Sequence, residues 1–255
     1  MNNYEIKYKK LLRKCLESGE KKITRTGVDC ISIFNKKISI NINKSFPMLT
    51  ARKMFEKTFK TEFEWFINGE TNIERFKSNN IKIWDAWADK NGDLGPVYGY
   101  QLKNFNGENI DQLNKVIEGI KLNPLSRRHI ISLWNPAQTD LMALPPCYSY
   151  FQFYVKKNKL NLTIMQRSGD LVAGVPYDIA LFSMLLLYVS EKTNLKPKNI
   201  CLNIVDAHIY TNQILPAKIY LKRPYYKLPI YEFKNGKIEI KNYISGESIK
   251  IPIAI

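Results

Sequence analysis

The sequence of 255 residues has only two histidines and four cysteines, and this scarcity excludes several kinds of site. The cysteines are Cys15, Cys30, Cys147 and Cys201. They lie far apart and form no CxxC pair, so the sequence indicates neither a zinc site nor a disulfide framework. Because His129 and His208 are the only histidines, we expect no protein-bound metal.

Long apolar runs and a leader-like start are also missing. The longest apolar stretch, IALFSMLLLYV at 179–189, is too short to span a bilayer and predicts a buried helix. The start, MNNYEIKYKKLLRKC, has no apolar run after its charges, so it is not a secretory signal. We therefore expect no membrane association and a cytoplasmic protein, or one in the host cytoplasm if a phage encodes it.

The formal net charge is +16, which is compatible with nucleic-acid binding. The lysines, however, are scattered along the whole chain, and no block of like charge forms a tail. General compositional bias is the simpler explanation. A positive field would still help to capture a small anionic substrate.

Repeats, low-complexity segments and Gly/Ser linkers are missing too, so we predict a single domain over residues 1–255. Helices are expected at 4–18, 51–67, 178–192 and 211–221. Strands are expected at 30–35, 37–42, 129–135, 150–155, 160–166 and 201–209, with short strands closing the chain. We expect turns near Lys36-Lys37 and at Lys157-Asn158, and a loop-rich stretch at 80–108. Strands and helices are mixed without a βαβ rhythm, which favours the α+β class.

The segment LPPCYSYFQFYV places Cys147 immediately before a predicted buried strand. A free cysteine in a core is usually a small hydrophobic residue. Here Pro145-Pro146 fixes the backbone, and MQRSGD after the hairpin brings Arg167 back toward the thiol. A nearby guanidinium lowers a thiol pKa and raises the thiolate fraction, so we expect Cys147 to be a nucleophile.

Several short motifs follow one another in a characteristic order. From the N-terminus these are RTG, FPMLT, IWDAWAD, GDLGPVYG, SRRHI, PPC with FQFYV, QRSGD, GVP, DAHIY and the C-terminal PIAI. In this order the chain, from Arg25 to Ile255, resembles the thymidylate synthase family. The resemblance implies the α+β thymidylate synthase fold, with a mixed β-sheet flanked by helices and a homodimer formed through the sheet face. It also implies a pyrimidine deoxynucleotide as substrate and 5,10-methylenetetrahydrofolate as co-substrate.

The resemblance assigns roles to single residues. Cys147 would attack C6 of the pyrimidine, which makes C5 nucleophilic. The substrate phosphate would be bound by Arg25, Arg167, Ser168 and, from a second subunit, Arg127 and Arg128. Arginine suits this role because it pairs bidentately with phosphate. The remaining substrate contacts would come from Gln166, Asp170, His208 and Tyr210, the last two at the sugar 3′-hydroxyl.

Other implied roles concern proton transfer and the folate. Glu62 matches the carboxylate that organises waters around the base, and Tyr98 matches a tyrosine that assists proton removal from C5. Burial of Glu62 among aromatic neighbours would raise its pKa toward acid–base use. The folate would lie against Ile83, Trp84, Trp87, Leu144, Asp170, Gly174, Tyr177 and Ala254. From the residues alone, these aromatic side chains are equally compatible with a core, and Arg127, Arg128 and His208 with ordinary structural positions.

Two positions depart from the family pattern. Asp178 replaces the asparagine that reads the base, and Tyr148 replaces the usual histidine after the nucleophile. An asparagine amide both donates and accepts, as uracil requires, whereas an ionised aspartate only accepts and suits the N4 amino group of cytosine. Phage deoxycytidylate hydroxymethylases carry aspartate at the matching place. The alternative is that Asp178 merely caps the following helix.

The sequence therefore predicts transfer of a one-carbon unit to C5 of dCMP, giving 5-methyl-dCMP. The 5-hydroxymethyl product carries nearly equal weight, because Tyr148 in place of the usual histidine could change the position of a water. Synthesis of dTMP from dUMP is a third enzymatic interpretation. A non-catalytic nucleic-acid-binding protein is the alternative from another class, and a salt titration of binding would identify it.

Overall fold

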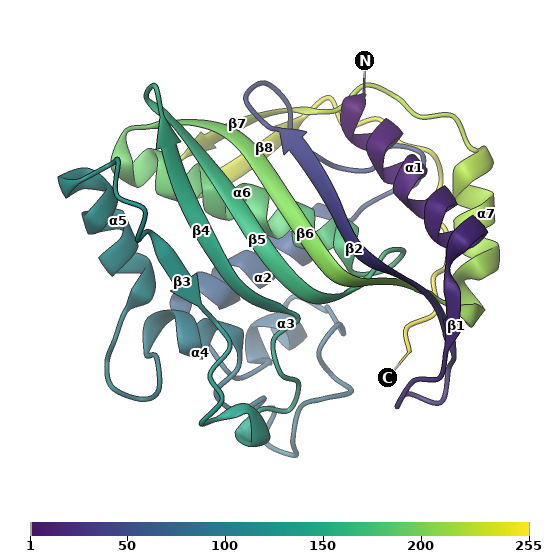
Figure 1. Ribbon diagram of the computed structural model, residues 1–255, viewed down its shortest axis with the longest axis horizontal. Helices are drawn as coiled ribbons and strands as arrows, with labels where there is room; N and C mark the ends of the chain where they lie inside the picture. Colours follow the sequence, from purple (N-terminus) through teal and green to yellow (C-terminus); the bar gives the residue numbers. More distant parts are fainter. Residues whose placement is uncertain (1, 255) are drawn as a thin grey trace.

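Strands with alternating apolar and polar residues build the central sheet. In β5 (Lys159–Asp170), Leu160, Leu162 and Ile164 are buried while the residues between them are partly exposed. The computed structural model describes residues 2–254, and its main sheet has the strand order β1-β2-β6-β5-β4-β3. The other strands of this sheet are β1 (Glu20–Lys22), β2 (Cys30–Asn41), β3 (Ile130–Ser132), β4 (Tyr148–Lys156) and β6 (Lys196–Tyr210). Only β5 and β6 pair in parallel, so the sheet is mixed, as predicted (Figure 1).

Helices cover one face of this sheet. The helices are α1 (Asn3–Ser18), α2 (Glu56–Asn68), α3 (Glu74–Ser78), α4 (Tyr98–Lys103), α5 (Gln112–Leu122), α6 (Val175–Thr193) and α7 (Ile214–Lys222), with 3-10 turns at Thr139–Leu141 and Thr211–Gln213. Helix α6 packs directly on β5 and β6, and α2 packs on α6 from the other side. Because α6 lies between two layers, it is apolar around most of its circumference. A second sheet is the hairpin of β7 (Ile230–Lys234) and β8 (Lys237–Lys241). The α+β prediction is confirmed.

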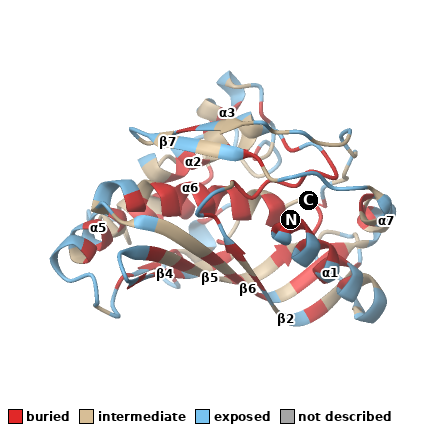
Figure 2. Cartoon of the chain, turned by 90° about the horizontal axis from the view of Figure 1, so that it is seen from above, coloured by how far each residue is buried: buried red, intermediate tan, exposed pale blue. Residues whose placement is uncertain are grey.

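The opposite face of the sheet is open. In Figure 2 the sheet lies below and helices α2 and α6 lie above it. Large apolar side chains are exposed on strands of this sheet, namely Ile130, Tyr150, Tyr154 and Val205. Tyr150 and Tyr154 lie four residues apart on β4 and therefore project from the same face of the sheet. Among residues 2–254, no helix is long and apolar enough to cross a membrane.

Local sequence signals located several elements correctly. The Lys157-Asn158 turn is the β4–β5 hairpin, and both residues have positive φ, at 49° and 56°, as a type I′ turn requires. The turn expected near Lys36-Lys37 is wrong. Strand β2 pairs with β6 in one register from Cys30 to Asn41, and it accommodates a left-handed Asn35 without breaking.

The helix expected at 51–67 begins at Glu56 instead. The N–H groups of Thr50 and Ala51 donate to the Glu5 carboxylate, and that of Met54 donates to the Tyr243 hydroxyl. These tertiary bonds hold residues 50–54 in an irregular, non-helical conformation. The stretch at 80–108 is mostly loop but contains α4, and neither α3 nor α5 was predicted.

Glu5 is the most strongly hydrogen-bonded buried carboxylate of the fold. Its side chain is fully buried and accepts from the Thr50 hydroxyl at 2.5 Å, the Thr50 and Ala51 amides at 2.8 Å, the Tyr220 hydroxyl at 2.5 Å and the Asn2 amide at 3.0 Å. These donors come from the N-terminus, the segment before α2, and α7. Charge-assisted bonds of this kind are roughly twice as strong as neutral ones. Glu5 therefore joins three distant parts of the chain.

We expect Glu5→Gln to lower the free energy of unfolding by about 2–4 kcal/mol, because the new amide group turns hydrogens toward donors that need an acceptor. Urea unfolding followed by circular dichroism measures the change. Glu17→Gln, at an exposed position of the same helix, is the matched control and should change little. Equal stability of the two variants would contradict this role of Glu5.

Candidate active site

The thiol of Cys147 lies at the point where the chain enters β4. The Arg167 guanidinium, on the neighbouring strand β5, donates hydrogen bonds to the carbonyls of Pro145 at 2.7 Å and Pro146 at 2.9 Å. The Arg167 amide also donates to the Cys147 carbonyl at 2.7 Å. One side chain and its own backbone thus fix the turn that carries the nucleophile. The structure brings Arg167 and Cys147 together as the sequence predicted.

Tyr98 approaches Cys147 from the start of α4. Its hydroxyl accepts a hydrogen bond from the Cys147 amide at 3.1 Å. The backbone φ of Tyr98 is 22°, a conformation that costs a non-glycine residue on the order of 1–3 kcal/mol. Strain of this kind persists where the surroundings impose it, and here it places the phenol against the nucleophile.

Burial controls the acidity of the Cys147 thiol. Desolvation raises the pKa of Cys147 above its ordinary value, and this effect outweighs the opposing charge of Arg167. The Asp178 carboxylate raises the pKa further, while the hydrogen bond to Tyr98 and the charge of Arg25 lower it. The expectation that Arg167 would lower the pKa was right in direction but incomplete, because the net shift is upward.

Two acidic side chains face this region from different helices. Glu62 projects from α2, and burial together with the charge of Asp178 raises the pKa of Glu62 to about 8. Asp178 projects from the first turn of α6, and burial raises its pKa to about 6 against the effect of a hydrogen bond from Gln166. At neutral pH the pair therefore carries one proton on Glu62 and one negative charge on Asp178. Such separated pKa values are typical of sites that carry out proton transfer.

The Gln166 amide fixes the orientation of Asp178. Gln166 Nε2 donates to Asp178 Oδ2 at 2.8 Å, and Gln166 itself is 2% exposed. The carboxylate cannot donate, so the NH₂ end of Gln166 must face it. Gln166 Oε1 is then left buried with no partner among residues 2–254. The alternative role of Asp178 as a helix cap is wrong, because α6 begins after Gly174 and the Asp178 side chain is directed to Gln166.

A group of polar side chains lies beyond Cys147, toward β2 and β6. Arg25 lies on the exposed segment between β1 and β2. Burial raises the pKa of Tyr210, and the charge of Arg25 opposes this rise, as it does for Cys147. The His208 and Tyr210 rings are 5.0 Å apart, edge to face. Asp206 holds His208, and this contact lowers the pKa of Asp206 well below its usual range. Ser168 lies on β5, opposite Asp206 in the register.

Arg127 and Arg128 do not join this group. Both are exposed in the connection between α5 and β3, and the Arg127 carbonyl accepts from Gln152 Nε2 at 2.9 Å. Gln152 lies five residues along β4 from Cys147, about 16 Å at 3.3 Å per residue. Within one chain the two arginines therefore lie away from the nucleophile.

An aromatic wall borders the other side of the site. Trp84 packs edge to face against Trp87 at 5.8 Å and Tyr98 at 5.6 Å. The buried Trp84 Nε1 has no hydrogen-bond partner among residues 2–254, so a donor is available to a bound molecule. Ile83, Leu144 and Tyr177 are partly buried beside the core.

Asp170 and Gly174 form the turn between β5 and α6, and Asp170 depends on a residue that sequence reasoning missed. Asp170 Oδ1 accepts from the amides of Val172 and Ala173, and its Oδ2 accepts from Gln213 Nε2 at 2.8 Å. Gln213 also donates to the Pro252 carbonyl at 2.9 Å, next to the buried Ala254. Gln213 thus connects the site to the C-terminal segment. No sequence signal marks it, because its burial results from tertiary packing; Ile255 lies outside the described residues.

Across residues 2–254, no group of three or more His, Cys, Asp or Glu side chains is arranged to hold a metal ion. All four cysteines are free. The described site therefore consists of a thiol, two coupled carboxyl groups, a phenol, an amide and arginines. Such a set can add a nucleophile to an electron-poor ring and move protons at neutral pH.

Comparison with known protein families gives one match that covers nearly the whole chain. A model of the family described as thymidylate synthase matches residues 6–255. The matched range includes every element of the site described above.

The raised pKa of Glu62 predicts a pH-dependent stability. Its folded pKa of about 8 exceeds the ordinary 4.5, so the folded state holds a proton that the unfolded state has lost, and stability falls as pH rises toward 8. Between about pH 6.5 and 9, above the pKa of Asp178, this contribution amounts to about 2 kcal/mol at 1.36 kcal/mol per pKa unit. We expect Glu62→Gln to lose this slope in urea unfolding. Glu64→Gln, at an exposed position of the same helix, should keep it; equal slopes for Glu62→Gln and the wild type would refute the assignment.

Proposed function

The chain belongs to the thymidylate synthase family of folate-dependent one-carbon transferases, and we propose that its substrate is dCMP. In this family the co-substrate 5,10-methylenetetrahydrofolate supplies the one-carbon unit and, where a methyl group forms, the hydride that completes it. The observation that carries the proposal of dCMP is the pairing of Asp178 with Gln166. We also propose that residues 1–255 act as one catalytic domain, since a continuous buried cluster extends from Tyr4 to Ile238.

The base would be selected by two acceptor atoms. Asp178 uses Oδ2 to accept from Gln166, which leaves Oδ1 for a ligand, and the orientation of Gln166 leaves its buried Oε1 without a donor. The N4 amino group of cytosine presents two hydrogens, whereas O4 of uracil presents only lone pairs. At this exocyclic position cytosine therefore pairs with an acceptor that would face the lone pairs of uracil O4, at a difference of about 1–3 kcal/mol for the unpaired group.

Cys147, Tyr98 and Glu62 would carry out the chemical steps. The Cys147 thiolate adds to C6, which makes C5 nucleophilic toward the one-carbon unit, and the C5 proton is then lost with help from Tyr98. Protonated Glu62 supplies and removes protons around the base. Loss of the C5 proton would expel tetrahydrofolate, because the electrons of the broken C–H bond form the C5–methylene double bond as the bond from the one-carbon unit to the folate nitrogen breaks. The methylene group then stands on C5 while Cys147 is still bound at C6, and the Cys147–C6 bond breaks when hydride or water adds to that group. Because burial raises the pKa of Cys147, we propose that close placement against the base, rather than a high thiolate fraction, drives the first step.

The product depends on what reaches this methylene group. We propose reduction to 5-methyl-dCMP, which is supported by the enclosing Trp84 and Ala254, at 7% and 9% exposure. Addition of water, giving 5-hydroxymethyl-dCMP, is the second candidate. It is favoured by Tyr148, whose ring is held 5.0 Å from Tyr98 and 4.8 Å from Phe182 and carries a hydroxyl into this part of the core.

We further propose a homodimer formed through the open sheet face. The exposed Tyr150, Tyr154 and Val205 would be buried there, and Arg127 and Arg128 would reach the phosphate site of the other subunit. Their distance from Cys147 within one chain supports this arrangement. Four free cysteines favour a reducing compartment, so we place the enzyme in the cytoplasm of its own cell or of a phage host.

The substrate proposal is tested by Asp178→Asn. Asparagine is nearly isosteric with aspartate, so the fold should be retained. It adds the donor that uracil O4 requires, so kcat/KM for dUMP should rise and that for dCMP should fall. With one unpaired buried group for each substrate, the ratio should change by about one to four decades.

Both substrates are measured on both proteins at fixed pH and folate concentration, and mass spectrometry of the products separates methyl from hydroxymethyl. Wild-type preference for dUMP, or a ratio that does not change, would overturn the assignment to cytosine.

The shared site is tested by mixing a protein that binds the nucleotide weakly with a protein that has no nucleophile, at a nucleotide concentration well below the KM of the first. Arg128→Ala damages the phosphate site that its subunit completes in the partner, and Cys147→Ser removes the nucleophile. After subunit exchange, each mixed dimer should contain one site free of both changes. Each mixed dimer should therefore have about half the activity of a wild-type dimer, as expected for a site shared across the interface. Arg167→Ala mixed with Cys147→Ser is the control, because both residues belong to one subunit's site. No recovery after verified exchange would count against sharing.

A further inference from the structure

The arginine loop, defined here as residues 123–128, carries Arg127 and Arg128 on a connection that is mostly exposed to solvent. Two short contacts shape it from within: the Arg128 amide donates to Ser126 Oγ at 3.2 Å, and the Ser126 amide donates to the Asn123 carbonyl at 3.1 Å. A third, from Gln152 Nε2 to the Arg127 carbonyl at 2.9 Å, attaches the loop to β4. Its start, at the end of α5, needs a separate attachment.

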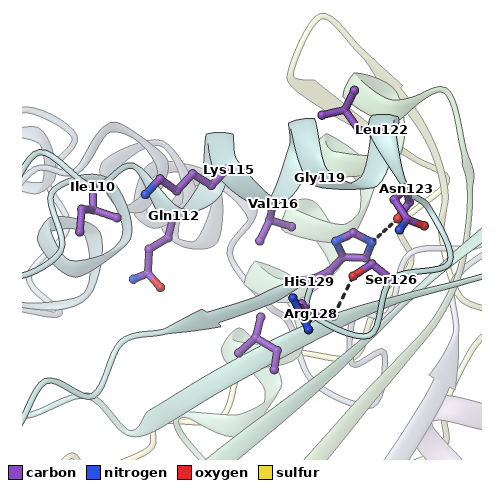
Figure 3. Close-up of a pocket in the computed structure, with 11 residues that line it drawn as sticks. Ile110, Gln112, Lys115, Val116, Gly119, Leu122, Asn123, Ser126, Arg128 and His129 are labelled. Atoms are coloured by element: carbon purple, nitrogen blue, oxygen red, sulfur yellow. Dashed lines mark hydrogen bonds between the residues drawn. The ribbon is translucent and has the colours of Figure 1, made fainter.

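His129 provides that attachment. His129 directly follows the loop and is 3% exposed. Its backbone is attached to β4, because the Phe153 amide donates to the His129 carbonyl at 2.9 Å. The His129 ring reaches back across the loop, and Nε2 lies 3.1 Å from the Asn123 carbonyl at the end of α5 (Figure 3). A carbonyl only accepts, so Nε2 carries the hydrogen.

The His129 ring lies at the edge of a cavity. Together with Val116, Gly119 and Arg128, the ring lines this cavity of about 440 Å³ between α5 and β3. A Cβ atom at Gly119 would lie 3.4 Å from His129 Nδ1, so any side chain longer than alanine would displace the ring. The ring and helix α5 are therefore fitted to one another at this point.

We propose that His129 is a positioning residue for the phosphate contacts that this subunit makes in its partner. This inference rests on the proposed sharing of Arg127 and Arg128. The bond from His129 to Asn123 closes the loop at its base, so the two arginines are presented in one orientation before the nucleotide binds. A loop that is ordered in advance loses less conformational entropy on binding, which strengthens binding without a new contact.

The test compares three variants of His129. His129→Phe keeps an aromatic ring in the cavity but has no donor, His129→Gln places a donor at similar reach, and His129→Asn has a donor too short to reach Asn123. We expect KM for the nucleotide to rise by about two- to tenfold in the Phe and Asn variants, the value of one hydrogen bond, with kcat nearly unchanged. His129→Gln should keep a KM close to that of the wild type.

Mixed dimers separate positioning from a general structural defect. When His129→Phe is mixed with Cys147→Ser, the one site with an intact nucleophile takes its arginines from the subunit with wild-type His129, so its KM should return to the wild-type value. A defect within the subunit would leave KM raised. If His129→Phe fails to fold, the same measurement is made with His129→Asn.

Arg128→Ala, measured in parallel, separates this inference from the proposed function. If Arg128→Ala leaves KM unchanged, the sharing of arginines fails. If Arg128→Ala raises KM while His129→Phe and His129→Asn do not, or if their raised KM persists in the mixed dimer, the role of His129 is overturned and the shared site stands. The assay uses whichever of dCMP and dUMP the wild type turns over, so its outcome does not depend on the base.

Discussion

The guanidinium of Arg167 donates hydrogen bonds to the carbonyls of Pro145 and Pro146, and the placement of the nucleophile depends on this contact. Two successive prolines have no amide hydrogen to offer to a neighbouring strand, so this turn cannot be held by an ordinary backbone ladder. A charged side chain from β5 supplies the missing attachment. Gln166 precedes Arg167 on β5, and successive side chains of a strand point to opposite faces. Gln166 therefore points toward α6, where it contacts Asp178. One strand thus sets the positions of the thiol and of the group that orients Asp178.

The electrostatics of the site follow from burial. Desolvation raises the pKa values of Cys147, Glu62 and Asp178 together, and the charge of Asp178 raises those of Cys147 and Glu62 further. Burial of these ionisable groups destabilises the folded state, and the apolar core that continues around the site through Tyr148, Phe151 and Phe182 offsets this cost. A region of low polarity strengthens the interactions of any charge that remains in it, and at neutral pH that charge is the Asp178 carboxylate.

The open sheet face and the arginine loop give the same indication. An apolar surface on the sheet and two arginines far from the nucleophile are both difficult to explain in an isolated chain. A second copy of the chain would account for both at once, and the ordered base of the arginine loop would then serve a site in another subunit.

The sequence alone determined the class of fold and the order of the family motifs, and it predicted Cys147 as the nucleophile, because these inferences depend on local patterns. The turn at Lys157-Asn158 was also predicted from local sequence, since two left-handed residues define this hairpin without contacts from elsewhere in the chain. Tertiary structure decided the rest. Helix α2 starts at Glu56 because Glu5 and Tyr243, both distant in sequence, take the amides before it. The tertiary structure also decided that Asp178 binds Gln166 instead of capping α6. In the same way, burial in the folded chain raises the pKa of Cys147 despite the charge of Arg167. Burial and long-range contacts set these properties, and neither can be read from the residues near a position in the chain.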